Sequence, residues 1–278
     1  MLAVRRLALC AALTSGGGGL VSARVTPSRS LASALNLRGG QLQACFFDFD
    51  GTLAQSEDTH RQTFSELLGF ELTPDYWNAK CVGNSPRSIL EKHLAPERLA
   101  AGETVDGLLQ RRTSLFEEHI EAGKLEATRG AQRIVAELRA RGVPCAVVSS
   151  GERSYIVKAL RAMGLLDMFQ AIVSGDDPDC SLPGRHKPSP YMYLRGCEAL
   201  GVSDPSQCIA FEDSLAGIKS AQAAGIPVVA MLTAVTDGIV PDPTDASPHA
   251  AALGRTSPVA PVAALVADFD AVPRALLA

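Results

Sequence analysis

The stretch Cys45-Phe46-Phe47-Asp48-Phe49-Asp50-Gly51-Thr52-Leu53 places two carboxylates two positions apart, where an apolar run breaks into a turn. Residues i and i+2 of a strand share a face, so Asp48 and Asp50 point the same way. Gly51 lets the backbone turn while its amides stay open to an anion. Two surface carboxylates would be the simpler explanation, but they follow three apolar residues without a solvent-facing spacer. The pattern therefore favours phosphate chemistry, in which one carboxylate attacks and the other handles protons.

The composition is that of a globular chain. Of its 278 residues, 46% are hydrophobic and 20% are charged, which suffices for one large core and a small inserted domain. The formal net charge is -4, and no run of Lys or Arg is interleaved with aromatic residues, so nucleic acid is disfavoured as a partner. The apolar stretches stop short of the roughly 20 residues that span a membrane. We expect a monomer that binds a small molecule, with no membrane integration of the mature protein.

The first 43 residues differ from the rest. No Asp or Glu precedes Asp48, whereas arginines are spread among Ser, Ala, Leu and Gly, as is typical of an organelle transit segment. We expect residues 1–43 to be a disordered targeting segment that is removed from the mature protein. An apolar patch at 7–13, followed by small residues at 21–23, is compatible with a two-part leader. We therefore expect a plastid (chloroplast) location, with the mitochondrion as the alternative.

The seven cysteines contain no C-x-x-C pair and no regular spacing, so neither a disulfide framework nor a zinc site is supported. Cys45, Cys145 and Cys208 sit in or beside apolar runs, which predicts buried thiols. A reducing compartment fits this usage best.

The coarse pattern predicts an α/β fold. Residues 58–123 are helical in pattern, with helices expected over 58–68, 86–94 and 104–121. From Arg129 onward, helices alternate with short apolar strands, which predicts right-handed crossovers and a parallel sheet covered on both faces. We predict a Rossmann-like core of residues 44–56 and 127–278, with a helical cap of residues 57–126 inserted. The expected strands are 143–149, 171–174, 208–211 and 227–232, and the expected helices are 131–141, 153–163, 191–200 and 215–224.

In such a sheet, ligands bind at the carboxyl ends of the strands. Polar groups follow several of the expected strands directly, so topology rather than sequence proximity collects them at one edge. They are Asp48, Asp50, Ser149, Ser150, Asp176, Asp177, Glu212 and Asp213.

Four motifs stand in order along the chain: FDFDGTL (47–53), VVSSG (147–151), HKPSP (186–190) and FEDSLAGI (211–218). Each follows an expected strand or opens an expected helix. Together they resemble the haloacid dehalogenase superfamily of phosphotransferases with an aspartate nucleophile. The position of the cap is similar to the branch that contains β-phosphoglucomutases and sugar phosphatases. The resemblance covers nearly the whole chain after Ala44.

The resemblance implies separate catalytic roles. Asp48 is the expected nucleophile, which forms an aspartyl phosphate. Asp50 is the expected general acid and base. Lys187 is expected to neutralise the phosphoryl oxygens and to keep Asp48 ionised. Ser149, in preference to Ser150, is expected to donate a hydrogen bond to the phosphate.

The resemblance also implies Mg2+ as the cofactor, because two carboxylates and a phosphate repel one another. The expected ligands are the Asp48 side chain, the Asp50 backbone carbonyl and Asp213. Glu212 is expected either to bind the ion directly or to contact one of its ligands. For Ser214, a helix N-cap and a ligand role are equally open.

Substrate contacts are expected around the turn and the hinge. Glu57 and His60 lie where this branch places a substrate-proximal histidine, although a lone histidine is more often structural. The cap would close over the substrate and exclude water. The expected substrate-binding residues are Gly51, Thr52, Glu57, His60, Ser150 and Gly151.

We therefore expect a Mg2+-dependent phosphatase of a small phosphomonoester, a sugar or polyol phosphate. The alternative is a β-phosphoglucomutase-like sugar phosphomutase. It is weakened because Pro86 stands where those mutases carry an arginine. The run KPSPYMYLRG (187–196) instead resembles the sugar and polyol phosphatases, whose helix reads K-P-x-P-x-x-Y-L-x-G. A non-catalytic sugar-phosphate-binding protein is the third possibility.

Overall fold

The computed structural model describes residues 42–81, 85–231, 262, 264–266 and 268–273. Most of the expected leader lies outside these residues. Leu42 and Gln43, which the prediction assigned to the leader, belong to the folded core instead. Leu42 is buried, and the backbone amide of Gln43 donates to Gln207 O (2.8 Å). The folded part therefore includes two residues before the predicted boundary.

Strand β1 (Ala44–Phe47) lies inside a six-stranded sheet of order β5-β4-β1-β6-β7-β8, in which every pairing is parallel. The Rossmann-like parallel sheet is thereby confirmed. Four strands match predicted ones, with ends shifted by up to two residues, and β8 was not predicted. The remaining strands are β4 (Cys145–Val148), β5 (Ala171–Val173), β6 (Cys208–Glu212), β7 (Val228–Met231) and β8 (Ala264–Val266).

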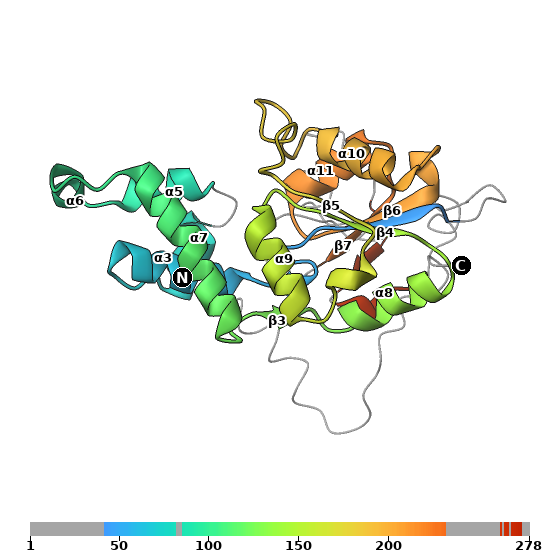
Figure 1. Ribbon diagram of the computed structural model, residues 1–278, viewed down its shortest axis with the longest axis horizontal. Coiled ribbons are helices and arrows are strands. Elements are labelled where there is room, and N and C mark those ends of the chain that lie inside the picture. The colour runs from blue at the N-terminus through green and yellow to red at the C-terminus, as the bar shows by residue number, and fades with distance from the viewer. Residues whose placement is uncertain (1–41, 82–84, 232–261, 263, 267, 274–278) are drawn as a thin grey trace, which may run out of the picture.

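The two faces of the sheet form separate apolar clusters, as the alternation of a strand requires. Cys45 and Phe47 pack in the cluster that includes residues of α8 (Ala131–Ala140) and α9 (Arg153–Ala162). Phe46 packs in the other, with residues of α10 (Tyr191–Leu200) and α11 (Leu215–Ala223). Both clusters are buried, which fixes β1 rigidly in the centre of the sheet (Figure 1).

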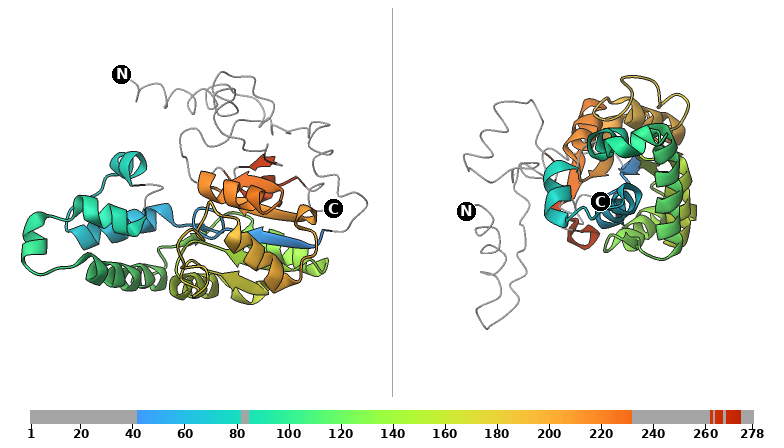
Figure 2. Two further views of the ribbon diagram at one scale, coloured as in Figure 1. Left: turned by 90° about the horizontal axis from the view of Figure 1, so that it is seen from above. Right: turned by 90° about the vertical axis from the view of Figure 1, so that its left-hand side faces the viewer.

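Five helices of the cap follow β1 in sequence and project from one end of the core (Figures 1 and 2). Three were predicted. The other two, α4 and α6, are short and begin at Pro74 and Pro96, because proline suits the first position of a helix. A cluster that includes Phe64, Leu90 and Leu108 gives the cap an apolar centre. The helices are α3 (Glu57–Leu68), α4 (Pro74–Lys80), α5 (Pro86–His93), α6 (Pro96–Ala100) and α7 (Val105–Glu121).

A short antiparallel pair joins the cap to the core. Strand β2 (Ala54–Gln55) pairs with β3 (Glu126–Ala127), and Gln55 Nε2 donates to Thr128 Oγ1 (2.8 Å). The chain thus leaves and re-enters the core through two adjacent segments.

The six cysteines in the described ranges are buried and form no disulfide. Those predicted to be buried thiols are confirmed, and burial raises the pKa of the Cys145 thiol to about 12. Within the described residues, no helix combines the length and apolar character needed to cross a bilayer.

Candidate active site

The turn after β1 brings the two motif carboxylates to the sheet edge. Phe49 O accepts backbone hydrogen bonds from Leu53 (2.9 Å) and Ala54 (3.0 Å), which closes the turn tightly. Gly51 has a φ of 73°, and a Cβ there would lie 2.0 Å from Asp213 Oδ2. Glycine is therefore required at this position for both reasons.

Lys187 connects three strand ends. Its Nζ donates to Asp48 Oδ1 (2.6 Å), to Glu212 Oε1 (2.6 Å) and to Val148 O (2.8 Å). Burial by itself lowers the pKa of this ammonium group, but the charges of Asp48 and Glu212 raise it above its usual value. The lysine is therefore held as a buried cation beside the predicted nucleophile.

Asp48, Glu212 and Asp213 form a buried acidic cluster whose carboxylate oxygens lie within 4.8 Å of one another. Burial raises the pKa of Asp48 to about 8, although Lys187 opposes this rise. Burial, with the charges of Asp48 and Glu212, also raises the pKa of Asp213. Three carboxylates against one ammonium leave an excess of negative charge, which a divalent cation would balance.

One carboxylate oxygen of Glu212 has no hydrogen-bond partner. Its Oε1 accepts from Lys187 and from the hydroxyl of Tyr193 (2.6 Å), whereas Oε2 is buried without a hydrogen-bond partner. The carboxylate packs against α11, where a Cβ on Gly217 would lie 1.9 Å from Oε2. A buried unpartnered oxygen is costly, so the acidic cluster fits a bound hard cation.

The Asp50 side chain is held by His60 of the cap helix α3 and by Tyr155 of the core helix α9. Its Oδ1 lies 3.0 Å from His60 Nε2, and its Oδ2 accepts from the hydroxyl of Tyr155 (2.7 Å). Burial alone would raise the pKa of Asp50, but the interaction with His60 and the hydrogen bond from Tyr155 lower it to about 2. With the side chain engaged there, the backbone carbonyl remains as the group that Asp50 could offer to a metal.

Arg112 of α7 fixes the proton position on His60. Its Nη2 lies 2.9 Å from His60 Nδ1, and a guanidinium can only donate, so Nδ1 accepts and Nε2 donates to Asp50. The imidazole also stacks on Phe116, with ring centroids 4.3 Å apart. His60 is thus a link between Asp50 and the cap.

The remaining predicted residues lie around these groups. Ser149 Oγ accepts from the amide of Gly151 (3.0 Å), which leaves its hydroxyl proton free to donate to a bound phosphate. Thr52 is buried, and its Oγ1 lies 3.5 Å from Asp213 Oδ1. Ser150 is exposed and lines a pocket between Asp50 and the cap.

Ser214, Asp176 and Asp177, which also follow strands of the sheet, form hydrogen bonds that hold local structure. Ser214 Oγ accepts from the amide of Gly217 (3.1 Å), which makes it the N-cap of α11. Asp177 accepts from Arg153 Nη2 (2.6 Å) and from Ser174, and Asp176 accepts from the Arg153 amide (2.8 Å). These two carboxylates lie after β5 but hold the loop and the start of α9.

A pocket of about 250 Å³ adjoins Asp50 on the side of the cap. We call it the cap-side pocket. Glu57 and His60 reach it from α3. It is lined by Asp50, Glu57, His60, Phe64, Trp77, Cys81, Pro86, Ile89, Arg112, Ser150, Gly151, Glu152 and Tyr155.

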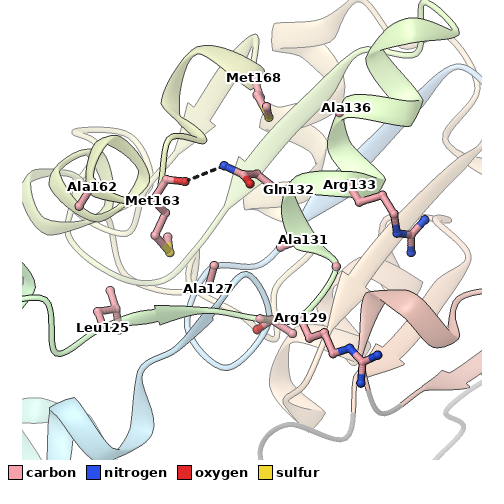
Figure 3. A pocket seen from close by; sticks show the side chains of 12 residues that line it. Leu125, Ala127, Arg129, Ala131, Gln132, Arg133, Ala136, Ala162, Met163 and Met168 are labelled. Carbon is pink, nitrogen blue, oxygen red and sulfur yellow. Dashed lines mark hydrogen bonds between the residues drawn. The ribbon is translucent and has the colours of Figure 1, made fainter.

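A larger hollow of about 790 Å³ lies elsewhere, beside β3, α8 and the end of α9 (Figure 3). Gln132 Nε2 donates there to Met163 O (3.2 Å). Its two arginines, Arg129 and Arg133, both pair with Asp270. None of the predicted site residues lines this hollow, so size does not identify the active site here.

Sequence reasoning missed Arg112, Tyr155 and Tyr193. A signal existed for Tyr193, which occupies the tyrosine position of K-P-x-P-x-x-Y-L-x-G. Arg112 and Tyr155 carried no local signal, because each lies on a helix remote in sequence from its partner.

A family model for haloacid dehalogenase-like hydrolases matches residues 42–225. This match covers more than half of the chain, which therefore belongs to that family. Protein CbbY of Rhodobacter capsulatus is 31% identical, over 71% of this chain and 88% of its own. Validoxylamine A 7'-phosphate phosphatase of Streptomyces hygroscopicus subsp. limoneus is 32% identical, over 69% and 86%.

Solved structures agree on the fold. A variant of CbbY from Rhodobacter sphaeroides in complex with xylulose-(1,5)bisphosphate has a TM-score of 0.59 at 23% identity, covering 69% of this chain and 86% of that chain. The family match and the curated relatives confirm the predicted superfamily and are consistent with the predicted branch. Within the hydrolases, the chain is an enzyme of the phosphoric monoester hydrolase class.

Proposed function

We propose that this chain is a Mg2+-dependent phosphatase that hydrolyses a small phosphomonoester, a sugar or polyol phosphate, through an aspartyl-phosphate intermediate. The observation that carries the proposal is the buried acidic cluster beside Lys187, next to a pocket that also contains Asp50. Nucleophile, cation site and acid/base thus share one sheet edge.

In the first step, a carboxylate oxygen of Asp48 attacks phosphorus while the bond from phosphorus to the leaving oxygen breaks. Asp50 donates a proton to that oxygen. Lys187 offsets charge at Asp48, and the Ser149 hydroxyl donates to a phosphoryl oxygen. The product is an aspartyl phosphate and a free alcohol.

In the second step, Asp50 takes a proton from water, and the resulting hydroxide attacks phosphorus. The bond between phosphorus and Asp48 then breaks, which releases inorganic phosphate, restores the Asp48 carboxylate and leaves Asp50 protonated, as at the start of the first step. The low pKa of Asp50 in the free protein keeps its carboxylate ionised, which is the form that can accept a proton. A phosphate dianion beside it raises that pKa, so the bound substrate favours the acid form.

Asp48, Glu212, Asp213 and the Asp50 carbonyl are the groups we propose to hold Mg2+. A bound Mg2+ would supply positive charge that draws the phosphate into the site and stabilises the transferring phosphoryl group. The unpartnered Glu212 Oε2 and the raised pKa values of Asp48 and Asp213 support this assignment.

Asp48→Asn tests the proposal. The amide keeps the shape but cannot attack, so turnover of any phosphomonoester should fall below detection while the far-UV circular dichroism and the melting profile persist. Chelation with EDTA should stop the wild-type reaction, and added Mg2+ should restore it. Retained activity in Asp48→Asn would remove Asp48 from the nucleophile role.

We also propose that residues 1–41 direct the chain to a plastid. The support is compositional: arginine-rich, serine-rich and free of acidic residues. A fluorescent protein fused behind this segment should accumulate in plastids, and accumulation in mitochondria would favour the alternative.

A further inference from the structure

We propose that the Tyr193 hydroxyl makes Glu212 a ligand that offers a single oxygen, and thereby sets the preference of the cation site for Mg2+ over Ca2+. This inference rests on the proposed function, since it concerns the cation site assigned there. Tyr193 is a positioning residue in this scheme, because it acts on the cation only through Glu212.

The ring of Tyr193 is held in place by packing. The side chain is fully buried in the apolar cluster that α10 forms with one face of the sheet. Its ring lies edge-on to Phe46 of β1, with centroids 6.1 Å apart, and Lys187 Nζ lies 5.3 Å from the ring centroid. The ring position therefore does not depend on the hydroxyl, which can be removed by itself.

One oxygen of Glu212 is fully occupied. Its Oε1 accepts from Tyr193 Oη (2.6 Å) and from Lys187 Nζ (2.6 Å). A carboxylate oxygen has two lone-pair sites, so these two donors leave none on Oε1 for a cation. Among the residues that the structure describes, Oε2 has no hydrogen-bond partner, although it is buried. Oε2 is thus the oxygen that Glu212 can offer.

The carboxylate of Glu212 is also prevented from turning. The backbone of α11 lies against it at Gly217, where a Cβ would be 1.9 Å from Oε2 and 2.2 Å from Oε1. Exchanging the two oxygens would break the hydrogen bonds from both Tyr193 and Lys187. Buried hydrogen bonds to a charged group are costly to lose, so the observed orientation persists.

The number of oxygens that a carboxylate offers distinguishes the two cations. Mg2+ requires a nearly ideal octahedron with ligands at about 2.0–2.1 Å, which suits one oxygen from each carboxylate. Ca2+ takes about six to eight oxygens at roughly 2.3–2.6 Å and often binds both oxygens of one carboxylate. Because Tyr193 withholds Oε1, the site supplies Ca2+ with fewer ligands and favours the smaller ion.

Tyr193→Phe removes the hydroxyl and keeps the ring, so it tests the inference directly. The Kd values for Mg2+ and Ca2+ are measured by isothermal titration calorimetry on the metal-free full chain. The Kd for Mg2+ should rise roughly tenfold, as loss of a group that orients a metal ligand typically causes. The Kd for Ca2+ should rise less, because the released Oε1 can join Oε2 on that ion. The ratio of the two Kd values should therefore shift several-fold toward Ca2+.

Two other tyrosines provide matched controls. Tyr155→Phe removes a hydroxyl that donates to Asp50 Oδ2 (2.7 Å) at the same sheet edge. The Asp50 side chain is not a proposed ligand, so the ratio of Kd values should stay at the wild-type value even where activity falls. Tyr191→Phe removes a hydroxyl of α10 that donates to Asp179 (3.1 Å), and it should alter neither Kd.

The failures are distinguishable. A ratio of Kd values that is unchanged in Tyr193→Phe, or that shifts equally in Tyr155→Phe, would overturn the inference and leave the proposed phosphatase intact. Wild-type protein that binds neither ion would overturn the cation site of the proposed function, and the inference with it.

Discussion

Tyr155 controls the proposed acid/base through a single hydroxyl. It donates to Asp50 Oδ2 (2.7 Å), while His60 holds the other oxygen. In Tyr155→Phe, one carboxylate oxygen loses its partner, and a hydrogen bond to a charged group is worth about 1.5–3 kcal/mol. Because that hydrogen bond also fixes the direction of the carboxylate, its loss should misplace the proton donor, and we expect kcat for an alkyl phosphate, whose leaving oxygen needs a proton, to fall roughly tenfold or more.

The measurement compares an alkyl phosphate with p-nitrophenyl phosphate, whose leaving group departs without protonation. The aryl substrate should lose little in Tyr155→Phe. Tyr191→Phe removes a hydroxyl that donates to Asp179 (3.1 Å) away from the site and serves as the matched control. Equal losses for both substrates would mean that Tyr155 acts on packing alone.

Gly217 is required by a contact rather than by its backbone conformation. Alanine in a helix is normally favoured over glycine by about 1 kcal/mol. Here the added Cβ would lie 1.9 Å from Glu212 Oε2, so the carboxylate must move. We expect Gly217→Ala to lose activity roughly 10- to 100-fold and to need higher Mg2+ concentrations, as a displaced metal-site group typically causes.

Gly107 offers a control at the same helical position. Its amide donates to the N-cap Thr104 Oγ1 (3.1 Å), just as that of Gly217 donates to Ser214, but it lies in the cap helix α7. Gly107→Ala should keep its activity. A Gly217→Ala enzyme with normal kinetics would show that Glu212 is not needed where the structure places it.

At the scale of elements, the short helix α6 secures the end of α3. Arg98 Nη1 donates to the carbonyls of Leu67 (2.9 Å) and Leu68 (3.0 Å), and Glu103 holds the same guanidinium. Cations favour helix C-termini, so α6 is more than a connection.

Arg98→Ala should therefore destabilise the cap by about 1–2 kcal/mol and lower the melting temperature by about 2–6 °C. The p-nitrophenyl phosphatase activity at low temperature should persist, because no site residue is touched. Hydrogen exchange should rise in α3 and α6 but not in the sheet, and uniform exchange throughout would contradict this local role.

For the whole molecule, the acidic cluster links stability to pH. The pKa of Asp48 rises from 3.8 to about 8 on folding, and that of Asp213 rises as well. Between these values the native state binds protons that the unfolded state has lost, so stability falls as pH rises through this window. In EDTA, the melting temperature should drop from about pH 5 to about pH 8.

Saturating Mg2+ should raise the melting temperature and flatten this slope, because a cation stabilises the ionised carboxylates. Asp213→Asn should show a shallower slope in EDTA and a weaker response to Mg2+. A melting temperature independent of pH in EDTA would contradict the charge balance that we assign to the cluster.

The local code of the sequence accounts for most of the fold. The alternation of helices with short apolar strands after Arg129 predicted the parallel sheet, whose strands confirm it. The same local pattern did not predict helices α4 and α6 or strand β8. Pro74 and Pro96 punctuate the cap but also begin helices α4 and α6, which are too short to show a period. β8 has three residues, and its pairing with β7 is a non-local contact.

What the sequence by itself determined is the set of groups at the sheet edge. Asp48, Ser149, Lys187, Glu212 and Asp213 each follow a strand or precede a helix, and parallel topology brings such positions together. Only the tertiary structure decided the partners and the pocket: Arg112 on His60, Tyr155 on Asp50, and Glu57 and Glu152 in the lining of one pocket. The reason is physical. A strand end is fixed by local pattern, whereas a contact between helices depends on how cap and core pack, which no short stretch of sequence encodes.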